Sequence, residues 1–158
     1  MKKVFILIAC FLISILIIYL GYNFMYQTTS PMQNFSKSPL SSDLREDMIK
    51  SEIWSPECPV SLDRLNILKI SYIDFEGNEH QDGKLVVHDV VADHVLAAFK
   101  NLYDNKFPIF NMNLINEYDG DDNKSLEANN TSSFNCRKIM NSNNLSIHSY
   151  GLAIDINP

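Results

Sequence analysis

The chain has 158 residues, of which 46% are hydrophobic and 20% are charged, and its formal net charge at pH 7 is −6. This length and composition predict one small globular domain with an appendage, rather than several domains. The acidic balance disfavours nucleic acid as a partner, because nucleic-acid binding requires a basic surface.

The appendage is an apolar N-terminal segment. Lys2 and Lys3 precede a run from Val4 to Tyr22 that contains no charged residue. A run of this length can span a bilayer as one helix, and the preceding lysines favour a cytoplasmic N-terminus. We therefore predict a single-pass membrane anchor over residues 1–26 with the following domain outside. A cleaved signal peptide is the alternative, against which stand the length of the run and the lack of a small-residue cleavage site.

The next two segments differ in composition. Residues 27–42 are rich in Ser, Thr, Pro and Asn without an apolar period, which predicts a linker. Residues 42–54 predict a helix whose N-cap is Ser42 or Asp43. The folded domain is accordingly expected over residues 43–158.

Alternating apolar residues indicate a hairpin in the first half of this domain. The alternation predicts strands over residues 65–75 and 84–88, with a turn at 76–78 and a long tip between them. Residues 90–103 then carry apolar side chains at helical spacing and predict a helix. On that helix, His94 is expected on the face opposite the apolar residues Val91 and Val95.

The second half of the domain has weaker patterns. Residues 108–115 suggest a further strand, and residues 120–137 form a polar loop long enough to suggest a functional role. The whole order predicts an α+β fold, a small antiparallel sheet with flanking helices, preceded by one N-terminal transmembrane helix.

The segment with the clearest chemistry contains His148 and Asp155. Residues 151–157 alternate like a short strand with Asp155 on the more polar face. An odd separation would direct the two side chains to opposite sides of an unbroken strand, so they converge only if the backbone bends at Gly151. Histidine and aspartate are both good Zn²⁺ ligands. The alternative is a buried histidine and an aspartate that only satisfy backbone groups.

Other polar residues allow more than one interpretation. A metal or substrate site and a solvated turn are both compatible with the acids Asp119, Asp121 and Asp122. Ordinary structural roles are expected for the remaining histidines, His80, His88 and His94. Cys58 and Cys136 lie in an oxidising compartment if the predicted topology holds, so a disulfide and two free thiols are both open.

The C-terminal pattern Ser-x-His-x-x-Gly-x-Ala-x-Asp, over residues 146–155, resembles the signature of the D-alanyl-D-alanine carboxypeptidases. These are zinc peptidases of bacterial cell-wall metabolism, and the resemblance is to their VanY-like branch. Blocks upstream resemble one subgroup of the family in the same order: Glu57–Val60, Gly83–Val87, Phe107–Ile109, Gly120–Asp122 and Asn129–Arg137. The resemblance covers positions 54 to 158.

The resemblance implies a site and a substrate. It makes His148 and Asp155 zinc ligands, and it makes Arg137 the residue that holds the substrate carboxylate or the scissile carbonyl. Ser146 would contact the substrate, a D-Ala-D-Ala stem peptide of peptidoglycan. The expected location is the bacterial cytoplasmic (inner) membrane, with the domain on its outer, periplasmic or extracellular, side.

Similar proteins supply the third zinc ligand and the general base from an element downstream of the Asn-Pro pair, and this chain ends at that pair. Two of the three expected protein ligands for Zn²⁺ are therefore present. We expect a zinc metallopeptidase-like protein whose site is complete only if its C-terminal half is supplied by another chain or is missing from this sequence. The alternative is a non-catalytic remnant that at most binds cell-wall peptide.

Overall fold

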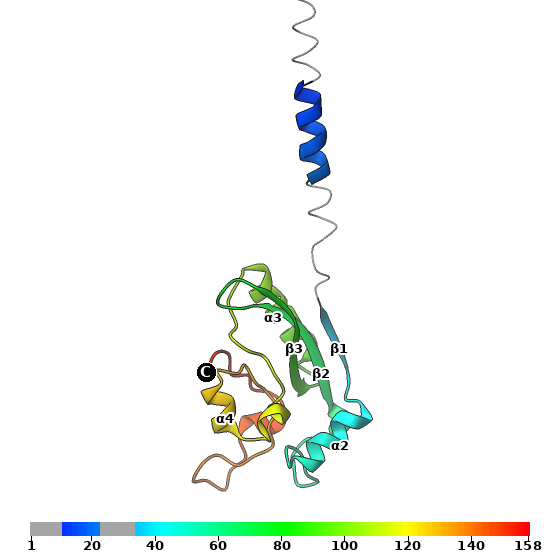
Figure 1. Cartoon of the computed structure of the whole chain (residues 1–158). Helices are drawn as coiled ribbons and strands as arrows, with labels where there is room; N and C mark the ends of the chain where they lie inside the picture. The colour runs from blue at the N-terminus through cyan, green and yellow to red at the C-terminus, as the bar shows by residue number, and fades with distance from the viewer. Residues whose placement is uncertain (1–10, 23–33) are drawn as a thin grey trace, which may run out of the picture. The chain divides into compact units, whose positions relative to one another are not determined.

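The computed structural model describes residues 11–22 and 34–158 of the chain. It divides into two compact units, Met1–Met32 and Gln33–Pro158. In the first unit, residues 11–22 are helical (Figure 1). Among the residues that are described, no helix is both long and apolar enough to cross a membrane. The predicted anchor begins before residue 11 and ends after residue 22, so its two ends lie outside the described residues.

The second unit is built on a three-stranded antiparallel sheet with helices beside it, which confirms the predicted α+β class (Figure 1). The strands are β1 (Phe35–Pro39), β2 (Leu65–Ile73) and β3 (Glu79–His88), in the order β1-β2-β3. The edge strand β1 lies inside the segment whose composition predicted a linker. Four of its five residues are exposed, so it has no buried face that could create an apolar alternation.

The hairpin between β2 and β3 is tighter than its sequence predicts. Strand β3 begins at Glu79 rather than near residue 84, so the connection is a short turn instead of a long tip. The turn is held by Asp74, whose Oδ1 accepts hydrogen bonds from the backbone N–H groups of Glu76 and Asn78 at 3.0 and 2.8 Å. The first residues of β3 are mostly exposed and polar, which hides the strand from an analysis of hydrophobic periodicity.

The helices follow the predicted order with shifted boundaries. Helix α2 (Ser42–Lys50) is capped by Ser41 rather than by Ser42 or Asp43, because the Ser41 side chain accepts from the backbone N–H of Leu44. Helix α3 (Ala92–Asp104) matches the predicted helix closely. A short helix, α4 (Asp122–Glu127), lies in the segment that was predicted as a polar loop.

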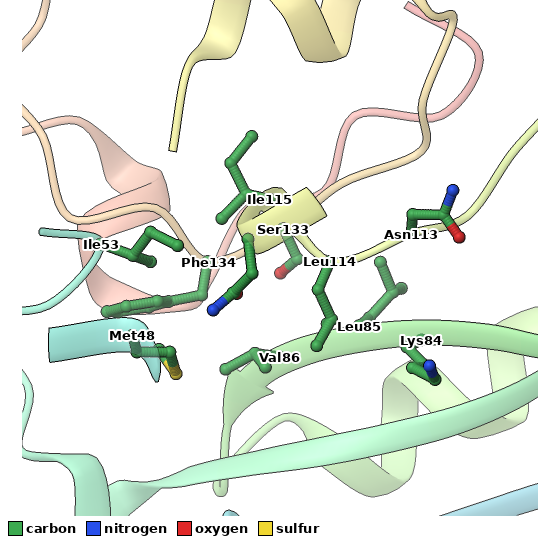
Figure 2. Close-up of a pocket in the computed structure, with 11 residues that line it drawn as sticks. Met48, Ile53, Lys84, Leu85, Val86, Asn113, Leu114, Ile115, Ser133 and Phe134 are labelled. Atoms are coloured by element: carbon green, nitrogen blue, oxygen red, sulfur yellow. The ribbon is translucent and has the colours of Figure 1, made fainter. Parts of the chain in front are cut away.

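Two hydrophobic clusters form the core, and neighbouring residues of β3 divide between them. Leu85 and Val87 belong to the cluster that contains Phe99 of α3, whereas Val86 belongs to the cluster that contains Met48 of α2. Figure 2 shows a small space beside the cluster that contains Met48, with Val86, Ile115 and Phe134 of this cluster among the residues that line it. The space left there is about 10 Å³, enough for a single water at most. This part of the core is therefore closed to a peptide ligand.

Two predicted strands are absent from the described structure. Residues 108–115 form only isolated bridges, Ile73 with Pro108 and Asn111 with Asn130. Residues 151–157 form a single bridge, between Asp155 and Ser132. In both segments apolar residues alternate in the sequence, but the backbone pairs with its neighbours at single points rather than along a ladder. The alternation therefore predicted strands that are not formed.

Candidate functional site

The candidate site is built around a 3-10 turn at Ile147–Tyr150. Ser146 begins the turn, since its Oγ accepts from the backbone N–H of His148 at 3.3 Å. Gly151 ends it with a φ of +65°, a conformation that side chains disfavour. A Cβ at Gly151 would lie 2.7 Å from the backbone nitrogen of His88, whose N–H donates to the Gly151 carbonyl. The chain reverses here because this position is a glycine.

The reversal brings His148 and Asp155 together, as the expected bend at Gly151 requires. Nε2 of His148 lies 3.3 Å from Oδ2 of Asp155. Asp155 is fixed by two backbone hydrogen bonds with Ser132, at 3.0 and 3.1 Å. The imidazole is 14% exposed and the carboxylate 48%, so the pair lies at the surface with the histidine recessed.

The orientation of the imidazole ring is set by Ser133. Nδ1 of His148 lies 2.6 Å from the Ser133 carbonyl oxygen. Because a carbonyl can only accept, Nδ1 carries the proton, and in the neutral ring Nε2 is left with its lone pair toward Asp155. Nε2 is therefore the ring nitrogen that could bind a metal ion beside Asp155.

The pair fits a zinc ion as two of its ligands. Ligands at roughly 2.1 Å in a tetrahedral zinc site are about 3.4 Å apart, close to the separation of Nε2 and Oδ2. A carbonyl on the other ring nitrogen is also the usual support of a metal-bound histidine. However, in residues 11–22 and 34–158 no group of three or more His, Cys, Asp or Glu residues is placed to hold a metal.

The other histidines lie elsewhere and have local partners. His80 stacks on Tyr72, and its Nε2 lies 2.8 Å from Oδ2 of Asp74. Nδ1 of His88 lies 2.8 Å from a carboxylate oxygen of Asp89. These contacts agree with the ordinary roles expected for the two residues.

His94 does not lie on the predicted face of α3. It lines a hollow of about 340 Å³ together with Val91 and Val95, the residues it was expected to oppose. Positions three and four apart share one side of a helix, so His94 lies on the same side of α3 as Val91. Leu152, Ile154 and Ile156 also line this hollow.

The three loop acids have separate roles. Asp119 forms an ion pair with Lys124 at 2.9 Å, and that hydrogen bond holds the pKa of the Asp119 carboxyl below its usual range. Asp121 caps α4 through the backbone N–H of Asn123. Asp122 alone contacts a candidate site residue, because its carboxylate forms an ion pair with Arg137.

Arg137 is attached to the turn that carries His148. The Oγ of Ser149 accepts from the Arg137 N–H at 3.0 Å and donates to the Arg137 carbonyl at 2.9 Å. The backbone N–H of Ser146 donates to the same carbonyl at 2.9 Å. On the other side, Cys136 is joined to Cys58 by a disulfide, so the two cysteines are paired rather than free in the structure. These hydrogen bonds therefore hold the backbone of Arg137 against the turn that carries His148.

Two supporting residues were missed by sequence reasoning. Ser149 is fully buried, and Ser133 is 5% exposed while its carbonyl orients His148. Both lie inside blocks that resemble the carboxypeptidases, but serine has no property in the sequence that separates a buried bridging hydroxyl from a surface one. Ser146, which the resemblance implied as a substrate contact, is 7% exposed and uses its Oγ to cap the turn.

Comparisons with known proteins add no relative. No protein-family model, no curated protein and no solved structure matches this chain significantly.

Proposed function

We propose that this protein is a membrane-anchored, zinc metallopeptidase-like protein that acts on D-alanyl-D-alanine peptides of the bacterial cell wall. One observation carries the proposal: His148 and Asp155 face each other at 3.3 Å while the second ring nitrogen of His148 is engaged by a carbonyl. This is the arrangement expected of two zinc ligands with a supporting partner. The sequence resemblance over residues 54–158 supplies the substrate class.

Each residue of the candidate site has a distinct role in this proposal. His148 and Asp155 would hold the ion, and Ser133 would keep the imidazole in the ligating tautomer. A bound zinc ion would lower the pKa of a water ligand toward ~7 and polarise the peptide carbonyl. Arg137 would bind the terminal carboxylate of the peptide or stabilise charge developing on the carbonyl oxygen.

A catalytic zinc site uses three protein ligands, and the described residues provide a pair. The proposal therefore requires a third ligand and a general base from outside the described residues. The second candidate function is a non-catalytic protein that binds cell-wall peptide through the same residues. It is favoured by the absence of a third ligand close to His148 and Asp155 within residues 11–22 and 34–158.

The proposed location follows from the charge-free run between Lys3 and Tyr22. It places the folded unit on the outer side of the cytoplasmic membrane, where stem peptides are found. A reporter enzyme fused after Pro158 should be active only on that side. Reporter activity in the cytoplasm would contradict both the location and the substrate class.

Zinc binding tests the proposed site directly. The full chain, purified in detergent, is titrated with zinc by calorimetry and compared with His148→Ala and with His80→Ala as the matched control. Binding should be weak, since two protein ligands hold the ion, and it should be lost only in His148→Ala. Equal binding by all three proteins would contradict the site.

Release of D-alanine from a D-Ala-D-Ala peptide separates the two candidate functions. The chain alone should release none at a measurable rate with added zinc, because the described residues place no third ligand beside His148 and Asp155. Zinc-dependent release that disappears in Asp155→Ala would instead show that the single chain is a complete enzyme.

A further inference from the structure

The ion pair between Asp122 and Arg137 is supported from a second side. Nε of Arg137 is buried against Oδ2 of Asp122. The other carboxylate oxygen, Oδ1, accepts a hydrogen bond from Nδ2 of Asn135 at 2.8 Å. The same nitrogen of Asn135 donates to the carbonyl of Gly120 at 3.2 Å. The Asp122 carboxylate is therefore fixed by its neighbours and does not simply follow the arginine.

The contact at Nε leaves the rest of the guanidinium available. An arginine has five N–H donors in a planar fork, and the two terminal nitrogens can bind a carboxylate by two parallel hydrogen bonds. The one hydrogen bond of a terminal nitrogen among the described residues is from Nη1 to the Lys138 carbonyl, and at 3.5 Å it is weak. The side chain is 38% exposed, so its free edge can meet a ligand.

A free arginine side chain loses conformational entropy when it binds, and a fixed one loses less. Both the backbone and the side chain of Arg137 are fixed here, the backbone by Ser149 and the side chain by Asp122. We infer that Asp122 is a positioning residue that presents the guanidinium of Arg137 to the terminal carboxylate of a peptide ligand. This inference rests on the proposed function, and it adds a residue and a recognised group to it.

The opposite role for Asp122 predicts the opposite result. If its carboxylate only neutralised Arg137, removing that charge would free the guanidinium and tighten the binding of an anion. If it positions Arg137, Asp122→Asn should weaken the binding of an anion despite the gain in positive charge. The direction of the change therefore decides between the two roles.

The experiment measures binding of two peptides to the full chain in detergent with zinc present. One peptide ends in D-Ala-D-Ala with a free carboxylate, and the other is its C-terminal amide. Wild type should prefer the carboxylate, and Asp122→Asn should bind it about tenfold more weakly while binding of the amide is unchanged. Asp119→Asn is the matched control, since it removes a carboxylate of the same loop that pairs with Lys124.

Hydrogen exchange of the Arg137 Nε–H, followed by NMR, provides a second readout that does not depend on the peptide. Exchange should be slow in wild type and in Asp119→Asn, and faster in Asp122→Asn. Carboxylate binding by Asp122→Asn that is unchanged or tighter overturns the inference, as does an equal loss for both peptides. If wild type binds the amide as well as the carboxylate, the inference fails while the proposed peptide binding stands. If it binds neither peptide, the proposed function fails with it.

Discussion

The sheet and the C-terminal segment of this domain are held together by different interactions. The β2–β3 hairpin with α3 buries apolar side chains such as Leu68 and Val87, which are fully buried. Residues 105–158 also bury apolar side chains such as Met112, but polar side chains are buried with them, and Asn130, Thr131 and Ser149 are equally inaccessible. These polar groups satisfy backbone groups that have no strand or helix to pair with. The candidate site therefore lies in the part of the domain whose backbone is held by individual side-chain hydrogen bonds.

The largest effect is expected when a glycine is replaced in each half. Gly151→Ala should lower the free energy of unfolding by about 3 kcal/mol or more, because a Cβ there would be 2.7 Å from a backbone nitrogen of β3. Gly77→Ala is the matched change in the hairpin, with a φ of +86° and nothing within 4 Å, and should cost about 1 kcal/mol. Urea denaturation measures both. Equal losses would mean that the close approach at Gly151 is unimportant.

A smaller effect is expected from a buried amide. Nδ2 of Asn130 donates to the Asn113 carbonyl and to Oγ of Ser125, both at 3.1 Å, and its Oδ1 accepts from the Asn113 N–H. Asn130→Ala should cost about 2 kcal/mol, since it leaves buried backbone groups unpaired. The exposed Asn123→Ala is the control, with a change within about 0.5 kcal/mol. A loss for Asn130→Ala no larger than for Asn123→Ala would contradict the importance of polar bridges in this half.

The smallest effect is a pH dependence in the hairpin. Hydrogen bonds from His80 and Asn78 hold the pKa of the Asp74 carboxyl well below its usual range. The folded protein thus favours the carboxylate, so this contribution to stability is complete above the ordinary aspartate pKa of ~4 and is lost as the pH falls below it. Thermal melts are recorded from about pH 6 to about pH 3. The melting temperature should fall less steeply with pH for Asp74→Asn than for wild type. The same slope in both proteins would contradict this role of Asp74.

The same difference explains which parts of the fold were predictable. Strand β2 is largely buried and α3 buries one face, and their apolar residues identified them. The edge strand β1 and the start of β3 are mostly exposed, so no period marks them. The two strands predicted near residues 108–115 and 151–157 show the converse error. In these two segments apolar residues alternate, but the backbone forms only isolated bridges with neighbouring segments.

The sequence predicted which residues form the candidate site, but not the hydrogen bonds that hold them in place. The spacing of His148 and Asp155 required a bend at Gly151 for the two side chains to converge, and the structure has this bend and places them 3.3 Å apart. The contacts of Ser133 and Ser149 come from segments distant in sequence and involve backbone groups. Any serine can make such bonds, so only the folded chain reveals which ones do.

The disulfide between Cys58 and Cys136 has a consequence for how the protein withstands proteolysis. It joins residues separated by 78 positions, and β2, β3, α3 and α4 all lie between them. A protease that cuts this interval once leaves the two fragments covalently linked. Residues 137–158, which contain Arg137, His148 and Asp155, would then remain attached to the N-terminal part of the chain.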